Sequence, residues 1–276
     1  MNPESGRLAA EEVQSLLRSR SIAVEILMAE LLPAASGFSR PPLSNFRVGA
    51  VALGSSGSLY LGANIEIPGN GLNQAVHAEQ AALANAFAYR ERGITAIAVT
   101  AAPCGHCRQF MNEIDGGSQI RVLVQGQRVV TLAELLPASF GPRDLGITAG
   151  LFSGSTATLR FVTESRHALA LVALEAAARA YAPHTNALSG CAVKTRSGET
   201  YAGSYLENAA FNPSLSPLQS ALVNVAVAGE EFGDIMHVAL VELQDAKISQ
   251  RPATEAALAA LSPRARADHF TALRSS

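Results

Sequence analysis

The sequence has few cysteines, few charged residues and no long apolar run, and each scarcity excludes a class of protein. Three cysteines among 276 residues are too few, and odd in number, for a disulfide-stapled scaffold. The 21 Lys and Arg are scattered among 23 Asp and Glu, so no basic stripe suited to a nucleic-acid backbone is visible. The most apolar helical stretch, HALALVALEAAARAYA, is short and contains Glu175 and Arg179, which indicates a buried helix rather than a membrane span.

What is present indicates a folded chain. Hydrophobic residues make up 48% of the sequence and charged residues 16%, a composition that folds, and the length is enough for two domains. The stretch MNPESGRLAAEEVQ has no apolar segment of the signal-peptide type. We therefore expect a cytoplasmic localisation, with neither nucleic acid nor a membrane among the partners.

Apolar residues recur at helical spacing early in the chain and then give way to strand patterns. The early part predicts two amphipathic helices, at 7–18 and 21–36. The next expected elements are strands at 46–53 and 58–66, a helix at 78–93, a strand at 94–101, a short helix at 107–114 and a strand at 120–126. This order predicts an α/β layered domain.

The second half of the chain repeats the pattern of the first. VGAVALGSSGSLYLGANIE, at 48–66, resembles SGCAVKTRSGETYAGSYLE, at 189–207, and each is followed by an Ala-rich helical stretch and a strand. We therefore predict a duplicated domain. The expected parts are a helical N-terminal segment at 1–38, a first core at 39–150, a linker at 151–165 and a degenerate second core at 166–276.

Four side chains of the first copy form a candidate site: His77 and Glu79 in VHAEQ, and Cys104 and Cys107 in PCGHC. A single Cys-x-x-Cys suits a structural zinc site, a redox pair or a catalytic metal site. A structural site needs four protein ligands, and the one remaining cysteine, Cys191, lies in the second copy. His77, Cys104 and Cys107 would supply the three ligands of a catalytic zinc, whose fourth position stays open for water.

His77 and Glu79 can converge only at the beginning of a helix, because residues two apart lie on opposite sides of a regular one. VHAEQAAL places them at such a beginning. His-x-Glu followed by Pro-Cys-x-x-Cys is the signature of zinc deaminases, in which the Glu is not a ligand and carries protons instead. We expect a structural role for the neighbouring Arg108 and no role for His106.

With VHAEQ, PCGHCRQFMNE and GSYLENAAFNP, the sequence from about 41 to 222 resembles the cytidine deaminases, in their long, two-core bacterial form. The resemblance implies a three-layer α/β/α sandwich, duplicated in one chain, with a small helical N-terminal segment. It implies a homodimer with one Zn²⁺ per chain, because the second copy lacks the ligands. The implied reaction is hydrolytic deamination of cytidine and deoxycytidine to uridine and deoxyuridine plus ammonia, in pyrimidine salvage.

The resemblance also implies roles for individual residues. In the order of their roles, these are the zinc ligands His77, Cys104 and Cys107, the proton shuttle Glu79, the ribose 3′-hydroxyl contacts Asn64 and Glu66, the ring Phe46 that packs on the pyrimidine, and the backbone of Ala78, which contacts the base. Phe140, Ala210 and Phe211 lie in segments that in this family reach the partner subunit's site. Ala102 stands where a threonine is common, a mild departure if that position acts through its carbonyl.

Other hypotheses stay open on the residues alone. The chain could be a zinc-stabilised protein that binds without catalysis, a thiol redox protein, or a deaminase of another base or of nucleic acid. A structural zinc site needs no carboxylate beside it, and a redox pair gives the His-x-Glu no role. The two-core length, together with Asn64 and Glu66, favours a free nucleoside as the substrate.

Overall fold

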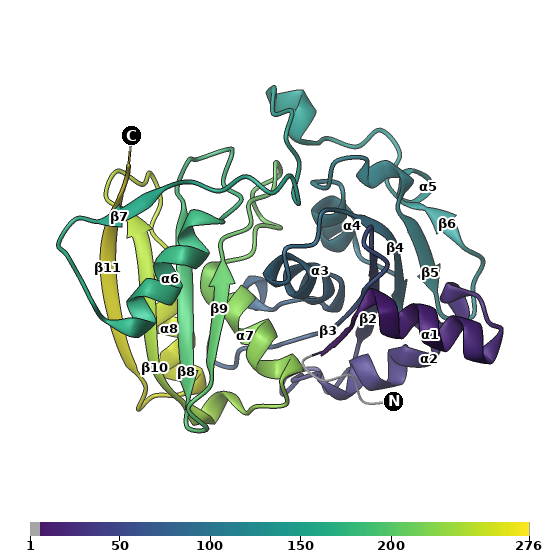
Figure 1. Ribbon diagram of the computed structural model, residues 1–276, viewed down its shortest axis with the longest axis horizontal. Helices are drawn as coiled ribbons and strands as arrows, with labels where there is room; N and C mark the ends of the chain where they lie inside the picture. Colours follow the sequence, from purple (N-terminus) through teal and green to yellow (C-terminus); the bar gives the residue numbers. More distant parts are fainter. Residues whose placement is uncertain (1–5, 276) are drawn as a thin grey trace. The chain divides into compact units, whose positions relative to one another are not determined.

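Two mixed β-sheets organise the protein, one in each of two units (Figure 1). The computed structural model describes residues 6–275, so the first residues of the predicted segment 1–38 lie outside the described part. Unit 1 contains the described residues up to 66, residues 75–153 and the segment 208–213, and the other described residues form unit 2. In residues 6–275 no helix is long and apolar enough to cross a membrane.

Unit 1 has the element order of an α/β domain. Its helices and strands are β1 (Arg7–Leu8), α1 (Ala10–Arg20), α2 (Val24–Gly37), β2 (Gly49–Gly54), β3 (Leu59–Ala63), α3 (Ala78–Ala88), β4 (Ile94–Val99), α4 (Gly105–Met111), β5 (Arg121–Val124), β6 (Val130–Thr131) and α5 (Leu132–Leu135). The strands lie in the order β1-β3-β2-β4-β5-β6, in which β4 and β5 are parallel and all other neighbours are antiparallel.

Helices cover both faces of this sheet, because alternate residues of a strand point to opposite sides. On one face, Val51 and Leu53 of β2 share an apolar cluster with Leu27 of α2. On the other face, α3 lies so close to β3 that a Cβ on Gly62 would stand 2.0 Å from the backbone nitrogen of Ala82. Only a glycine allows that approach. Unit 1 is therefore an α/β/α sandwich.

Unit 2 repeats this architecture. Its helices and strands are β7 (Leu159–Phe161), α6 (Ala168–Ala178), β8 (Ser189–Thr195), β9 (Thr200–Ser204), α7 (Pro217–Val227), β10 (Ile235–Leu243), α8 (Arg251–Leu261) and β11 (Arg266–Arg274), with the strand order β7-β11-β10-β8-β9. A Cβ on Gly190 would meet the backbone of α6, and a Cβ on Gly203 would meet the backbone of α7, at 2.2 Å in both cases. These helices thus cover opposite faces, and the expected duplicated sandwich is confirmed.

The two units also repeat individual hydrogen bonds. The Asn85 side chain donates to the Leu61 carbonyl at 2.9 Å, and in unit 2 the Asn224 side chain donates to the Ala202 carbonyl at 2.8 Å. A serine and a tyrosine donate to one glutamate in each unit, namely Ser56 and Tyr60 to Glu91, and Ser197 and Tyr201 to Glu230. The duplication therefore extends from the sequence pattern to specific contacts inside each unit.

Several expected element boundaries were wrong. The helix expected from residue 7 begins at Ala10, because Arg7 and Leu8 form β1 and pair with β3; the strand expected at 58–66 ends at Ala63, and the helix expected at 107–114 is Gly105–Met111.

Tertiary contacts explain two further differences. The strand expected from residue 46 begins at Gly49, because the Asn64 side chain donates to the Phe46 carbonyl and accepts from the Val48 amide, which keeps these residues out of the sheet ladder. The helix expected at 78–93 ends at Ala88, and Glu91 beyond it accepts hydrogen bonds from the β2–β3 turn.

Candidate active site

Two helix beginnings bring the four predicted site side chains together. α3 begins at Ala78, so His77 is its N-cap residue and Glu79 lies in its first turn. α4 begins at Gly105, so Cys104 is the N-cap residue and Cys107 lies in the first turn. The His77 Nδ1 atom lies 3.4 Å from the Cys104 sulfur and 3.3 Å from the Cys107 sulfur, and the two sulfurs are 3.7 Å apart.

These separations suit a zinc ion. Tetrahedral zinc, with bonds of about 2.3 Å to sulfur and about 2.0–2.1 Å to nitrogen, holds two sulfurs about 3.8 Å apart and a sulfur and a nitrogen about 3.6 Å apart. All three donor atoms therefore need to move by only a few tenths of an ångström to bind one ion. His77, Cys104 and Cys107 fit zinc both in donor chemistry and in spacing.

One other group among the described residues could hold a metal ion: His167, His237 and Asp268, in unit 2. This group is not the counterpart of the first, because Ser216 is the N-cap residue of α7 where His77 is that of α3. Its polar atoms are also engaged. The His237 Nε2 atom lies 2.7 Å from Asp268, and the His167 Nδ1 atom accepts the amide proton of Ala170 at 3.4 Å.

The three candidate ligands strongly affect one another's charge. Hydrogen bonds from Cys107 and His77 lower the pKa of Cys104 to about 3, so Cys104 is a thiolate at neutral pH. The hydrogen bond between His77 and Cys104 raises the pKa of His77, although burial opposes that shift. The pKa of Cys107 is raised well above its ordinary value by Cys104 and then by burial.

Glu79 is the buried carboxyl group beside the cluster. Its side chain is 4% exposed, and this burial raises its pKa. The Cys107 thiol donates to Glu79 Oε2 at 3.2 Å, which places the carboxyl group next to the sulfurs and away from bulk solvent. A buried carboxyl group with a raised pKa can serve first as a proton acceptor and then as a proton donor.

A pocket of about 270 Å³ opens beside the cluster. It is lined by Ser44, Phe46, Val48, Asn64, Glu66, the run from Ala75 to Glu79, Ala101, Ala102 and Cys104. The structure thus brings every predicted substrate-binding residue to the same cavity as His77 and Glu79. Phe46 is 60% exposed and Ala78 is buried.

For three residues near the site, the structure can be compared with the role that the sequence predicted. Ser44 lines the pocket and donates to Glu66, a contact that the sequence did not suggest. His106, for which no role was expected, stacks on His77 with ring centroids 5.2 Å apart. Arg108 has the expected structural role: it donates to the carbonyl oxygens of Pro103 and Leu135, at 2.8 Å each.

The residues predicted to reach a partner subunit lie outside this pocket, at the surface of unit 1. Phe140 is 47% exposed and Phe211 66% exposed, and Ala210 is also exposed. Gln109 of α4 ties their segments together, since it donates to the Phe140 carbonyl at 2.8 Å and its own carbonyl accepts from Asn208 at 2.9 Å.

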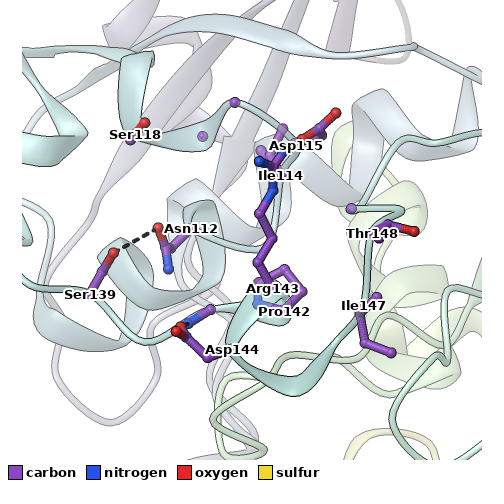
Figure 2. A pocket seen from close by; sticks show the side chains of 14 residues that line it. Asn112, Ile114, Asp115, Ser118, Ser139, Pro142, Arg143, Asp144, Ile147 and Thr148 are labelled. Atoms are coloured by element: carbon purple, nitrogen blue, oxygen red, sulfur yellow. Dashed lines mark hydrogen bonds and ion pairs between the residues drawn. The ribbon is translucent and has the colours of Figure 1, made fainter.

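A second cavity of unit 1, of about 300 Å³, is lined by residues of the segments 112–118 and 139–150 (Figure 2). There the Arg143 side chain forms an ion pair with Asp115 at 2.9 Å, and Ser139 donates to Asn112 at 3.3 Å. These groups satisfy one another, and the lining contains neither a cysteine nor a histidine. The cavity therefore lacks the chemistry of the first pocket.

Known proteins place this fold and site in one class. Models described as "Cytidine and deoxycytidylate deaminase zinc-binding region" match residues 23–123 and residues 132–255, which defines a zinc-dependent deaminase with two cores. A cytidine deaminase of Vibrio atlanticus is 44% identical over 256 residues, covering 93% of this chain and 86% of the relative. A cytidine deaminase of Cronobacter sakazakii is 45% identical over 260 residues, covering 92% and 85%.

A solved cytidine deaminase from Burkholderia pseudomallei aligns with 42% of this chain and 98% of its own, at 34% identity and a TM-score of 0.38. From the sequence matches, the chain belongs to the cytidine deaminase family, in its two-core bacterial form. Zn²⁺ is its metal cofactor.

We predict one zinc ion per chain in protein purified without added metal, measured by elemental analysis. Cys104→Ala or Cys107→Ala should abolish zinc binding, because each leaves only two donors in the cluster. Cys191→Ala is the control matched to Cys107→Ala: it removes a buried thiol, in β8, and should leave the zinc content unchanged. A second equivalent of zinc that disappears in His237→Ala would contradict the stoichiometry and assign that ion to unit 2.

Proposed function

We propose that the protein catalyses zinc-dependent hydrolytic deamination of cytidine and deoxycytidine to uridine and deoxyuridine, with release of ammonia. The observation that carries this proposal is the position of Glu79, a buried carboxyl group beside the His77, Cys104 and Cys107 donors. Because a structural zinc site needs no such carboxyl group, a zinc-stabilised binding protein is not favoured. The names of the relatives support the same reaction.

The residues of this chain divide the work of the reaction. His77, Cys104 and Cys107 would hold the zinc, which supplies a Lewis acid that activates water. Glu79 is the group that would carry both protons of the water, one at a time, the first to the ring nitrogen and the second to the leaving amine. Its burial matters here, since the raised pKa lets one carboxyl group serve as base and then as acid.

The remaining pocket residues suit a nucleoside. Phe46 offers an aromatic face to the pyrimidine and the backbone of Ala78 offers polar groups to the base. Asn64 makes one donor and one acceptor contact with the 46–48 backbone, so its amide retains one N–H and one lone pair for the ribose 3′-hydroxyl. At about 270 Å³ the pocket lies just below the range of about 300–1,000 Å³ for small-molecule sites, as suits a ligand as small as a nucleoside.

We predict that Glu79→Gln separates metal binding from chemistry. The substitution keeps the size of the side chain but removes the proton carrier. Zinc content should stay at the wild-type level, while kcat for cytidine falls by at least about 10²–10⁴-fold, the usual effect of losing a general acid–base group. Zinc by elemental analysis and ammonia release measure the two effects, and near-normal turnover in Glu79→Gln would refute the assigned role.

We further predict a preference for the free nucleoside over cytosine in a polynucleotide. A 3′-phosphodiester would place negative charge against Glu66, and bare cytosine would leave the sugar-facing groups of Asn64 unpaired, at a cost of about 1–3 kcal/mol. The test compares kcat/KM for cytidine, cytosine and a short cytosine-containing oligonucleotide. Equal values for cytidine and the oligonucleotide would identify an enzyme that acts on nucleic acid.

We also infer a cytoplasmic homodimer that acts in pyrimidine salvage, with no membrane or nucleic acid among its partners. Free thiols that bind a metal suit a reducing compartment. Two exposed phenylalanines on segments linked through Gln109 suit an interface between subunits. In such a dimer the exposed Phe140, Ala210 and Phe211 would help to wall the partner's pocket.

The dimer predicts a concentration-dependent loss of activity in Phe211→Ser. Removing an exposed aromatic ring from the proposed interface should shift the protein toward monomer and lower kcat/KM by about tenfold or more, as interface anchors commonly contribute over 1 kcal/mol. Ile26→Ser, which removes an apolar side chain that is 49% exposed in α2, is the control and should remain dimeric. Sedimentation equilibrium gives the mass, and a monomeric wild type with full activity would rule out the dimer.

A further inference from the structure

Glu66 is bound by a turn that stands at the mouth of the pocket, formed by residues 43–46 and called here the Phe46 turn. The Leu43 and Ser44 amides donate to Glu66 Oε2 at 2.8 and 2.9 Å, and the Ser44 hydroxyl donates to Oε1. The same hydroxyl oxygen accepts the Phe46 amide proton at 3.0 Å. Three of the roughly four acceptor positions of the carboxylate are therefore filled by this turn.

Unit 2 contains the same arrangement around Glu207. The His184 and Thr185 amides donate to Glu207 Oε2 at 2.7 and 3.2 Å, and the Thr185 hydroxyl donates to Oε1. The Ala187 amide in turn donates to that hydroxyl oxygen at 3.1 Å. Even the backbone matches: Asn45 and Asn186, at equivalent places in the two turns, have φ values of 55° and 60°.

Unit 2 provides an internal control, because it keeps the contact between the carboxylate and the turn but lacks the counterparts of His77 and Glu79. Ser216, the N-cap residue of α7, stands in the place of His77, and Leu218, in the first turn of α7, stands in the place of Glu79. Tyr205 stands in the place of Asn64. In unit 2 the carboxylate keeps its hydrogen-bond partners although the zinc ligand and the proton carrier are gone. The carboxylate is therefore needed by the backbone of the turn. Its hydrogen bonds do not depend on a nucleoside.

The two turns differ in the residue that they present. Ala187 in unit 2 is 2% exposed, whereas Phe46 at the equivalent place in unit 1 is 60% exposed and lines the pocket. Asn64 adds a second support that unit 2 lacks, by donating to the Phe46 carbonyl at 2.9 Å. In unit 1, a fold-level contact therefore fixes an exposed aromatic ring beside the candidate active site.

We propose that Glu66 is a positioning residue, which contributes to nucleoside binding by holding the Phe46 turn in the conformation that presents Phe46 to the pyrimidine. A bond from the 3′-hydroxyl to the fourth acceptor position is compatible with this role but secondary to it. Burial opposes ionisation of Glu66, but the hydrogen bonds from Ser44 and Leu43 outweigh it and lower the pKa of the carboxyl group. The part of this inference that concerns nucleoside binding rests on the proposed function; the part that concerns the turn does not.

Hydrogen exchange of the substrate-free enzyme, followed by mass spectrometry, tests the role in the turn without any activity measurement. Glu66→Gln keeps one acceptor oxygen where the carboxylate has two, so the turn loses at least one of its hydrogen bonds to this side chain, and exchange within 43–46 should accelerate by about tenfold. Ser44→Ala removes a single hydroxyl and should accelerate exchange at Phe46 to a smaller extent. Thr185→Ala is the matched control, with faster exchange only in its own turn.

Kinetics on cytidine and 3′-deoxycytidine distinguish positioning from a direct sugar contact. Positioning predicts that Glu66→Gln raises KM for 3′-deoxycytidine as well as for cytidine and changes kcat less. Ser44→Ala should shift KM in the same direction, and Thr185→Ala should match wild type. Wild-type exchange in the 43–46 amides of Glu66→Gln, with a KM increase confined to cytidine, would overturn the proposal. If Glu66→Gln does not fold, unchanged exchange in Ser44→Ala overturns it equally.

Discussion

The convergence of two helix beginnings is the constraint on which this structure depends. His77 and Cys104 are both N-cap residues, and Glu79 and Cys107 follow in the first turns of the same two helices. An N-cap residue has extended backbone angles and stands outside the helical repeat, so its side chain is free to point along the helix end. Four side chains can thereby meet at one point without distorting either helix.

The sheet fixes where these beginnings lie. α3 approaches β3 at Gly62 more closely than any residue with a Cβ would allow, and Gln80 of α3 donates to the Pro213 carbonyl at 2.8 Å. The Arg108 guanidinium holds the loop before α4 through the Pro103 carbonyl. Zinc coordination demands that the donor atoms be placed to within a few tenths of an ångström. These backbone contacts provide that placement.

A comparison of α7 in unit 2 with α3 in unit 1 shows that the site residues make the beginning of α3 less stable. In unit 2 the Ser216 hydroxyl accepts the Gln219 amide proton at 3.2 Å, an ordinary N-cap bond that contributes typically about 1 kcal/mol. In unit 1 the imidazole of His77 faces two sulfurs instead. Leu218, in the place of Glu79, is 2% exposed and apolar, so unit 2 avoids burying a carboxyl group as well. Unit 2 thus has the more stable choice at each of these positions.

The sequence by itself determined the order of most elements and was enough to predict the zinc ligands. Strand patterns at 48–66 and 189–207 predicted a duplicated α/β domain, because alternation and helical spacing are local properties of the chain, and the family resemblance added the α/β/α sandwich. His-x-Glu at a helix beginning and Pro-Cys-x-x-Cys predicted the donor set, because together they match the signature of zinc deaminases. Only the tertiary structure decided where β2 begins, that Ser44 supports Glu66, and that His106 stacks on His77. Each of these depends on side chains that are distant in sequence or brought together by a turn, and no local pattern records such a contact.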